Sequence, residues 1–591
     1  MQKRNVAILL VFAVFVLAMI AVGLLLVSSF GKSSLGFGGV AAGTILEVDF
    51  ETAVLEYIPP DPVAQLTLQE TPQVRDLVEA LVKAADDDRI VGLVARVGQG
   101  GMGVAQLQEI RDAVLAFRAG GKPAYAFAET FGEVNTGNSS YYLATAFDKI
   151  FLQQSGDVNI TGLLVDNPFL RGMLEKIGVE PRMDHRHEFK NAMNMFTETE
   201  LTEAHREASR ALMTSIFDQM VAGMAEGRNM TQERFRELIA AGPFYGQEAL
   251  DNGLVDALAY RDEVYAQMRD AAGSDSSLLY LGAYLDQGRA WNKGEAIALI
   301  YGVGGITRGE SQFNAASGSA TMGSDTVAAA LRAAVADDDV RAILFRIDCN
   351  GGSYVASDTV LREVKRAQEA GKPVIVSMGN VAASGGYFVA LSADKIVAQP
   401  STITASIGVL GGKLLTNGLW EKIGLSWDGV ATSANASMWS STHDYDEAQW
   451  ERHTFWLDRV YEDFTTKVAE GRDLPIERVR EIAKGRVWTG AQAKENGLVD
   501  ELGGFPVALR LAREAIGLTA DASIELRSFP PPRTFWEELM ADGPTSSEAA
   551  VVAMARMLET VRPMARMAER IGLIETYPKT LALPEDMIPR P

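Results

Sequence analysis

The chain has 591 residues, of which 47% are hydrophobic and 22% are charged, and its formal net charge is −22. This length predicts several domains or a repeated unit with a large core. The acidic excess repels phosphate and argues against a nucleic-acid partner, and the single cysteine, Cys349, excludes an intrachain disulfide and a cysteine-based metal site.

The N-terminus predicts a membrane anchor. Lys3 and Arg4 precede residues 6–27, a run of 22 residues without a charge. A helix of this length crosses a hydrocarbon core of about 30 Å, and the basic residues favour a cytoplasmic N-terminus. A cleavable signal peptide is the alternative, but its apolar region is usually only about 7–15 residues long. We therefore expect residues 1–27 to be a cytoplasmic start and single-pass anchor in the inner membrane, with the body outside the cytoplasm.

A linker follows the predicted anchor. Residues 28–43 are rich in Gly and Ser, a composition typical of flexible connections.

Beyond the linker, the chain repeats itself at an offset close to 246 residues. Three segments recur unchanged: Asp-Lys-Ile at 148–150 and 394–396, Glu-Lys-Ile-Gly at 175–178 and 421–424, and Asn-Gly-Leu-Val-Asp at 252–256 and 496–500. The last pair is 244 residues apart, so two residues are lost between the copies. This many matches at nearly one offset indicates a duplicated unit.

Each copy alternates short apolar runs with helical stretches. In the second copy, buried strands are predicted at 296–303, 342–347 and 373–378, and helices at 324–335 and 357–370. This alternation predicts βαβ units and a parallel sheet. We therefore expect two α/β domains, at 44–290 and 291–520, and a C-terminal tail, at 521–591, with an amphipathic helix at 547–571.

The two copies differ where the third predicted strand of the second copy ends. Ser384-Gly385-Gly386 follows this strand and opens a predicted helix, whereas the position 246 residues earlier is Asn138 and both glycines are missing. Glycines allow a substrate backbone to approach closely, and a helix N-terminus offers free N–H groups to an oxyanion. Ser384 is therefore a candidate nucleophile. The alternative is that it only caps the helix.

A second glycine pair, Gly351-Gly352, follows another predicted strand end. Because ligands of parallel sheets bind at the carboxyl ends of strands, amides of this pair are expected to face Ser384. The first copy keeps Gly100-Gly101, so the pair belongs partly to the scaffold.

A serine nucleophile needs a base. None of the five histidines lies in a strand–turn context with an Asp partner. Lysine can replace histidine when burial lowers its pKa from about 10.4 to about 7–8. Lys190 lies in a moderately apolar segment, and the second copy has alanine there, Ala436 or Ala434 depending on where the two residues are lost. The serine and the lysine thus occur in opposite copies, which predicts one site assembled from two halves.

These features resemble long-form signal peptide peptidase A, also called protease IV, with its duplicated Clp-protease/crotonase-like domain. The resemblance rests on the basic start and single anchor, the duplication, the segment ending at Lys190, and residues 380–387 and 400–408. One departure is that the family often has Ser-Pro-Gly-Gly where this chain has Cys-Asn-Gly-Gly at 349–352, which predicts a looser turn.

The resemblance implies roles for five residues. Ser384 would attack the peptide carbonyl, Lys190 would take its proton, and Ser406 would position the lysine amine. Gly352 and Gly385 would supply the amides of an oxyanion hole.

The resemblance also implies a function. We expect a membrane-anchored serine endopeptidase that degrades apolar peptides such as cleaved signal peptides, needs no cofactor or metal, and assembles as a homo-oligomer, a tetramer by family resemblance. Two alternatives stay open. A crotonase-like acyl-CoA enzyme would not need Ser384 and Lys190 together, and a catalytically inactive membrane scaffold would not need either.

Overall fold

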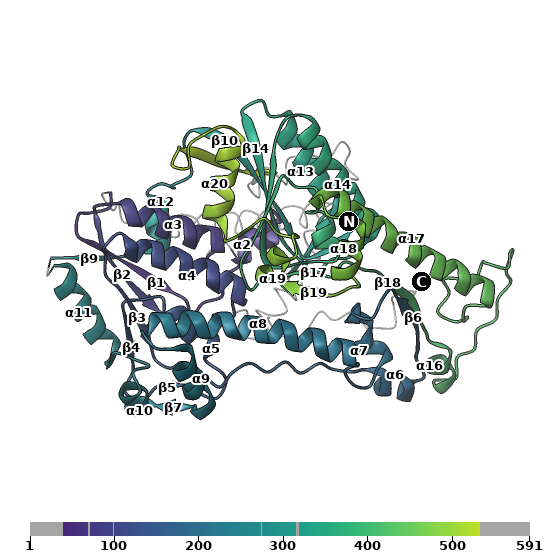
Figure 1. The fold of residues 1–591 in the computed structure, drawn as a ribbon, viewed down its shortest axis with the longest axis horizontal. Helices are drawn as coiled ribbons and strands as arrows, with labels where there is room; N and C mark the ends of the chain where they lie inside the picture. The colour runs from purple at the N-terminus through teal and green to yellow at the C-terminus, as the bar shows by residue number, and fades with distance from the viewer. Residues whose placement is uncertain (1–38, 69–70, 99, 274, 315–317, 532–591) are drawn as a thin grey trace, which may run out of the picture. The chain divides into compact units, whose positions relative to one another are not determined.

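The computed structural model describes residues 39–68, 71–98, 100–273, 275–314 and 318–531 (Figure 1). The predicted anchor at 6–27 and the predicted amphipathic helix at 547–571 lie outside these ranges. Within the described ranges, no helix is both long enough and apolar enough to span a bilayer.

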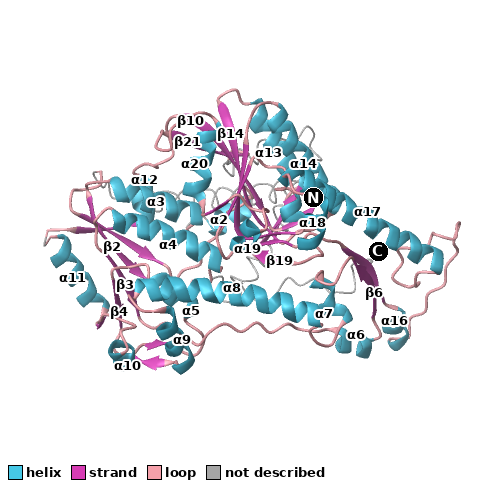
Figure 2. Ribbon diagram, in the orientation of Figure 1, coloured by secondary structure: helices cyan, strands magenta, loops and turns pink. Residues whose placement is uncertain are grey.

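The first copy contains a six-stranded sheet in which every pairing is parallel. From edge to edge its strands are β8 (Ala257–Leu258), β4 (Lys149–Leu152), β3 (Ala124–Ala128), β2 (Ile90–Arg96), β1 (Thr44–Asp49) and β9 (Ser277–Tyr280). Parallel strands need crossover connections, and helices supply most of them here (Figure 2). The predicted α/β class is confirmed for this copy.

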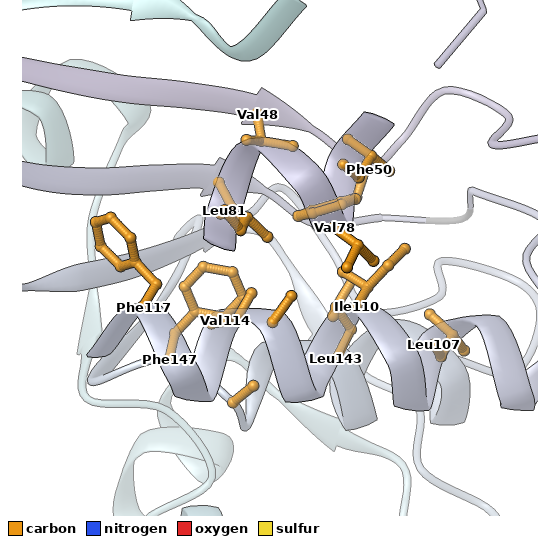
Figure 3. Close-up of a cluster of buried hydrophobic side chains, with 14 of the residues drawn as sticks. Val48, Phe50, Val78, Leu81, Leu107, Ile110, Val114, Phe117, Leu143 and Phe147 are labelled. Atoms are coloured by element: carbon orange, nitrogen blue, oxygen red, sulfur yellow. The ribbon is translucent and has the colours of Figure 1, made fainter. Parts of the chain in front are cut away.

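Helices of different lengths follow the strands of the first copy, and longer ones such as those at 74–86 and 232–241 bury apolar residues spaced three and four apart. They are α2 (Pro62–Leu68), α3 (Val74–Asp86), α4 (Val104–Ala119), α5 (Asn138–Ala144), α6 (Arg171–Ile177), the 3₁₀ turn η1 (Asn191–Met193), α7 (Asn194–Thr197), α8 (Glu203–Gly227), α9 (Gln232–Ala241), α10 (Gly246–Asp251), α11 (Arg261–Ala272) and α12 (Leu281–Asp286). In α3, Leu77, Val78 and Leu81 share the buried face. Figure 3 shows this face in the same core cluster as Val48 of β1 and Ile110 of α4.

The second copy contains an eight-stranded sheet in which only the β17–β19 pairing is antiparallel. Its main path runs β19 (Val487–Thr489), β17 (Ile403–Ala405), β15 (Val374–Ala383), β14 (Val340–Cys349), β10 (Glu295–Val303) and β21 (Ile524–Phe529). Off this path, β16 (Lys395–Ala398) pairs with β15, and β20 (Glu501–Leu502) pairs with β16. The three predicted strands correspond to β10, β14 and β15 and are confirmed. Strand β21 lies past residue 520, so this sheet includes residues that we predicted as tail.

The helices of the second copy are α13 (Ser324–Ala336), α14 (Tyr354–Glu369), α15 (Gly385–Phe388), α16 (Asn417–Lys422), α17 (Glu447–Arg472), α18 (Ile476–Ile482), α19 (Gly490–Glu495) and α20 (Phe505–Ala515). The first two confirm the predicted helices. Helix α14 begins three residues earlier than predicted because Ser353 caps it, accepting a hydrogen bond from the Ala356 amide. Small pairings complete the fold: β11 (Gly305–Thr307), β13 (Ser319–Gly323) and β12 (Phe313–Asn314) form one sheet, and β5 (Asp157–Val158) pairs with β7 (Phe244–Tyr245).

Equivalent hydrogen bonds confirm the duplication. Tyr141 donates to the Leu254 carbonyl in the first copy, and Tyr387 donates to the Leu498 carbonyl in the second. Asp256 likewise accepts from the amide of residue 150, and Asp500 accepts from the amide of residue 396. These residues, which recur in the sequence, therefore make the same hydrogen bonds in both copies.

The two copies share one core and exchange a strand pair. Leu299 and Leu344 of the second sheet, with Phe505 of α20, belong to the same buried cluster as Val78 of the first copy. In addition, β6 (Glu180–His185) of the first copy pairs antiparallel with β18 (Leu410–Leu415) of the second. These contacts bring the segment after β6 to the carboxyl end of the second sheet.

Candidate active site

Ser384 lies at the turn between β15 and α15. Its backbone has φ 54° and ψ −117°, a conformation that is unfavourable for a residue with a side chain. The turn is fixed because the Ser384 amide donates to the Ala405 carbonyl of β17 at 2.7 Å. The Ser384 side chain accepts no capping hydrogen bond from α15. The alternative that Ser384 serves only as a helix cap is therefore wrong.

The β6–β18 pair, which joins the two copies, places Lys190 next to this turn. Beyond β6, the Arg186 amide donates to the Val409 carbonyl at 3.0 Å and the Phe189 amide donates to the Lys484 carbonyl at 3.2 Å. Lys190 follows directly and is buried, with 5% of its surface exposed.

The amine of Lys190 lies within hydrogen-bond distance of three oxygen atoms. Its Nζ lies 3.0 Å from Ser384 Oγ, 3.0 Å from Ser406 Oγ and 2.8 Å from the Ser406 carbonyl oxygen. The structure thus brings together three predicted residues that come from both copies. Within the described part of the chain, no histidine hydrogen-bonds to Ser384 and no carboxylate forms an ion pair with Lys190.

Burial lowers the pKa of Lys190 to about 7. A neutral amine has two N–H groups and one lone pair. The Ser406 carbonyl can only accept, and Ser406 Oγ, which donates to the Gly485 carbonyl at 3.4 Å, can accept the second N–H. The lone pair is then left for the hydroxyl proton of Ser384. This arrangement is that of a base beside a nucleophile.

The two glycine turns meet beside Ser384. A Cβ atom on Gly351 would lie 2.7 Å from Ser384 Cβ, and a Cβ atom on Gly385 would lie 3.1 Å from the Gly352 nitrogen. Among the described residues, neither the Gly352 amide nor the Gly385 amide has an acceptor. Two free amides next to a nucleophile form a suitable position for an oxyanion.

The predicted loosening of the Cys-Asn-Gly-Gly turn is not seen. The Ile306 amide donates to the Gly351 carbonyl at 2.8 Å, and the Ser353 amide donates to the Ile306 carbonyl at 3.0 Å. Cys349 is 1% exposed, and burial raises the pKa of its thiol to about 11. Strand β11 therefore holds the turn in place of the proline, and Cys349 is a small buried residue.

Three residues that position the site were not found from the sequence. Asp348 accepts from the Val381 amide at 2.9 Å and so ties the glycine turn to the strand that carries Ser384. Burial, with Glu56 nearby, raises the pKa of Asp348 to about 6. Gly408 and Gly485 pack against the side chain and backbone of Lys190. Comparison of the copies offers a signal for two of them, because the first copy ends its strand without an acid there and has Ala241 at the position 244 residues before Gly485.

The corresponding place in the first copy holds no such pair. Asn138 donates to the Gly162 carbonyl at 2.6 Å and accepts from the Thr161 amide at 3.1 Å, and Ile160 occupies the position of Ser406 in the core. These side chains support a loop.

A cavity of about 390 Å³ lies beside the amine site. Apolar and polar side chains line it, among them Phe169, Phe189, Met195, Leu212 and Ser406. Its position next to Ser406 suits an apolar side chain of a bound ligand. The described residues contain no cluster of three or more His, Cys, Asp or Glu side chains arranged to hold a metal ion.

Two stretches of the chain, residues 116–275 and 366–519, match the model of peptidase family S49. Together they make up more than half of the sequence, with one stretch in each copy. The chain belongs to peptidase family S49. Lys190 lies in the first matched stretch of this S49 peptidase, and Ser384 and Ser406 lie in the second.

Relatives match over most of this S49 peptidase. Protease 4 of Haemophilus influenzae is 31% identical over 487 residues, which are 79% of this chain and 77% of the relative. Protease 4 of Salmonella typhi is 32% identical over 74% of this chain and 71% of its own length. The chloroplastic serine protease SPPA of Arabidopsis thaliana is 29% identical over 79% of this chain and 69% of its own length. The chain is thus a serine protease of the signal peptide peptidase A type with a duplicated domain.

Proposed function

We propose that this chain is a membrane-anchored endopeptidase that cuts apolar peptides, signal peptides among them, with Ser384 as nucleophile and Lys190 as general base. The observation that carries the proposal is the 3.0 Å separation of Lys190 Nζ and Ser384 Oγ, with the amine buried among serine oxygens. Membership of a peptidase family favours this function over the acyl-CoA enzyme and the inactive scaffold.

The chemistry follows from the positions of the groups. The neutral amine of Lys190 accepts the hydroxyl proton of Ser384 while Oγ bonds to the peptide carbonyl carbon. The amides of Gly352 and Gly385 donate to the oxyanion that forms. Lys190 then returns the proton to the leaving amine, and the peptide bond breaks to leave an acyl-enzyme. Water, deprotonated by the same amine, hydrolyses the ester and frees Ser384.

Several features support an apolar substrate near a membrane. The cavity beside Ser406 carries aromatic and aliphatic side chains. The uncharged run at 6–27 has the length of a membrane anchor, which would keep the body close to peptides released from the bilayer. A fold with its nucleophile behind two glycine turns suits an extended peptide backbone.

The test compares the full-length protein in detergent with Ser384→Ala and Lys190→Ala on a fluorogenic apolar peptide. We expect each variant to lose at least about 10³-fold in kcat, and the double variant to lose little more, because residues that act as one unit are not additive. Ser139→Ala, beside the equivalent position of the first copy, and Lys149→Ala on the surface should keep parental activity. A Lys190→Ala variant that stays active would refute the proposed base.

A further inference from the structure

The strand that carries the nucleophile is interrupted shortly before its end. Strands β14 and β15 pair in register as far as Ile347 and Met378, and they pair again at Cys349 and Ala382. Residues 379–381 of β15 therefore stand opposite a single residue of β14, and we call these three residues the bulge. Bulges turn side chains out of the regular alternation of a strand and are frequent next to active sites.

The second copy holds both ends of the bulge. The Val381 amide donates to Asp348 Oδ1 at 2.9 Å, and the Thr402 hydroxyl donates to the Gly379 carbonyl at 2.8 Å. The middle residue of the bulge, Asn380, makes its side-chain hydrogen bond in the other direction, to the first copy.

Asn380 caps a helix of the first copy. Its Oδ1 accepts a hydrogen bond from the Gln106 amide at 3.1 Å, and Gln106 is the third residue of α4. The amides of a first helical turn have no acceptor within the helix, and the side chain of the N-cap residue normally bonds to the amide of the second or third residue. The N-cap of α4 is Gly103, which has no side chain. Asn380 therefore supplies from the second copy the acceptor that this helix lacks.

The glycine at this N-cap is explained by the space that Asn380 occupies. A Cβ atom on Gly103 would lie 2.2 Å from Asn380 Oδ1 and 2.3 Å from its Cγ. The backbone of Gly103, with φ −71° and ψ 158°, is open to any residue, so conformation does not require glycine. In the second copy the corresponding helix, α14, has Ser353 as N-cap, and its own side chain accepts from the Ala356 amide. The two copies thus cap equivalent helices in different ways.

The same helical turn also meets the buried charges between the copies. Gln106 Nε2 donates to Glu56 at 3.1 Å, and Glu56 pairs with Arg346 at 2.6 Å. Arg346 in turn donates to Ser377 Oγ of β15 at 2.8 Å. The first copy therefore reaches the strand before the nucleophile through this chain of bonds and, directly, through Asn380.

We propose that Asn380 is a positioning residue for peptide hydrolysis: its bond to α4 sets the place of the Ser384 turn relative to the copy that supplies Lys190. Ser384 lies four residues beyond Asn380, and the three residues between them pair with β17, so a displacement of the bulge is passed along β15 to the turn. Lys190 arrives by a separate route, the β6–β18 pair. The separation of amine and hydroxyl therefore depends on how the copies fit together at the bulge. The inference rests on the proposed roles of Ser384 and Lys190.

The first experiment measures kcat, KM and melting temperature of the full-length protein in detergent on a fluorogenic apolar peptide. Asn380→Ala should lose about 10- to 100-fold in kcat, because a displacement of about 1 Å at a catalytic group has effects of this size. Its KM should stay within about twofold of the parental value, since Asn380 acts through β15 and not on the bound substrate. Asn380→Asp should recover most of the loss, because a carboxylate keeps an acceptor oxygen at the start of the helix.

Ser528→Ala is the matched control. Arg75 of the first copy donates to Ser528 Oγ at 3.3 Å, so this variant also removes a hydrogen bond between the copies. Ser528 lies on β21, which is separated from β15 by β14 and β10. The variant should keep the parental kcat, and a loss equal to that of Asn380→Ala would overturn a specific role for the bulge.

The second experiment tests the contact between Asn380 and α4 with a double variant. Gly103→Ala should lower kcat by itself, because its new Cβ atom overlaps the Asn380 side chain. In the Asn380→Ala background the overlapping atoms are gone, so the same substitution should change kcat by less than about twofold. Losses that add up in the double variant would show that the two residues act separately and would overturn the proposal.

Further outcomes would contradict the positioning role. These are a parental kcat in Asn380→Ala, a loss that appears in KM alone, and a loss in Asn380→Asp as large as in Asn380→Ala. Melting temperatures show whether each variant is folded, and Gly103→Ala tests the same contact without changing Asn380. A failure of the proposed dyad gives a different result, because Ser384→Ala or Lys190→Ala would then stay active whatever the Asn380 variants do.

Discussion

The buried environment of the Lys190 amine disfavours its charged form. No carboxylate among the described residues compensates it, so burial alone lowers the pKa of this lysine to about 7. Ser406 contributes two of the three oxygens around Nζ and so fixes where the lone pair points. Lysine is usually a strongly hydrated cation, but with this pKa a large fraction of the Lys190 amine is neutral near pH 7 and can act as a base.

Activity should therefore depend on pH through this group. Below pH 7 the amine is protonated and cannot accept the Ser384 proton, so kcat/KM should fall by about tenfold for each pH unit. Between pH 7 and 9 it should approach a plateau. A pH–rate profile from pH 5 to 9 on an apolar peptide checks this, and a profile that is flat from pH 6 to 8 would contradict it.

The same lowered pKa of Lys190 should also appear in the pH dependence of the free energy of unfolding. The pKa of Lys190 is lower in the folded protein than its ordinary value of 10.5, so between pH 7 and 10.5 the unfolded chain binds the extra proton. This lysine therefore makes the free energy of unfolding rise with pH in that window, by up to about 1.4 kcal/mol per unit. In Lys190→Met that contribution should disappear from urea titrations.

At the scale of elements, two turns form a channel for the lysine. Gly485, with φ +79°, lies so near Lys190 that a Cβ atom added to it would be 2.5 Å from Lys190 Cβ. A Cβ on Gly408 would be 3.3 Å from Lys190 Cδ. The turn before β19 and the turn between β17 and β18 thus need glycine for the space that Lys190 occupies.

We expect Gly485→Ala to reduce kcat by at least about 100-fold, because a displacement of about 1 Å at a catalytic group has effects of this size. Gly371→Ala is the control: Gly371 has φ +80° but nothing within 4 Å, so it shares the backbone strain without the contact. Backbone strain should cost each variant about 1 kcal/mol of stability, Gly485→Ala should lose more because its new Cβ overlaps Lys190, and Gly371→Ala should keep its activity. Equal activities would show that Gly485 does not position the lysine.

At the scale of the molecule, a buried charge cluster links the two copies. Arg346 of β14 is fully buried and pairs with Glu56 at 2.6 Å and Glu109 at 2.9 Å, both in the first copy. Phe505 adds to the cluster, since its amide donates to Glu109 at 2.6 Å. Because the site needs one residue from each copy, this cluster helps to keep the halves in register.

Removing the buried cation should be costly. Arg346→Met leaves two buried carboxylates unpaired, and we expect the free energy of unfolding to fall by about 3–5 kcal/mol. Arg96 occupies the equivalent strand position in the first copy but is partly exposed, as are its acidic partners Asp49 and Glu51. Arg96→Met should therefore cost less than about 1 kcal/mol in the same urea titration. Similar losses would show that burial is not what makes the cluster strong.

The sequence by itself determined the duplication, the α/β class and the main candidate residues. Apolar runs identify β10, β14 and β15 because parallel strands are buried on both faces. Comparison of the copies identified Ser384 and Lys190 because each is absent from the equivalent place, and no contact had to be known. The boundaries at 290 and 520 stay predictions, as does the anchor at 6–27.

Only the tertiary structure decided how these residues meet. The contact of Lys190 with Ser384 spans 194 positions and depends on the β6–β18 pair, whose strands are only partly apolar. The roles of Gly408, Gly485 and Asp348 are likewise set by distance in space. Pattern in a sequence reports local geometry and burial, whereas the pKa of an amine and the space beside it depend on packing between segments far apart in the chain.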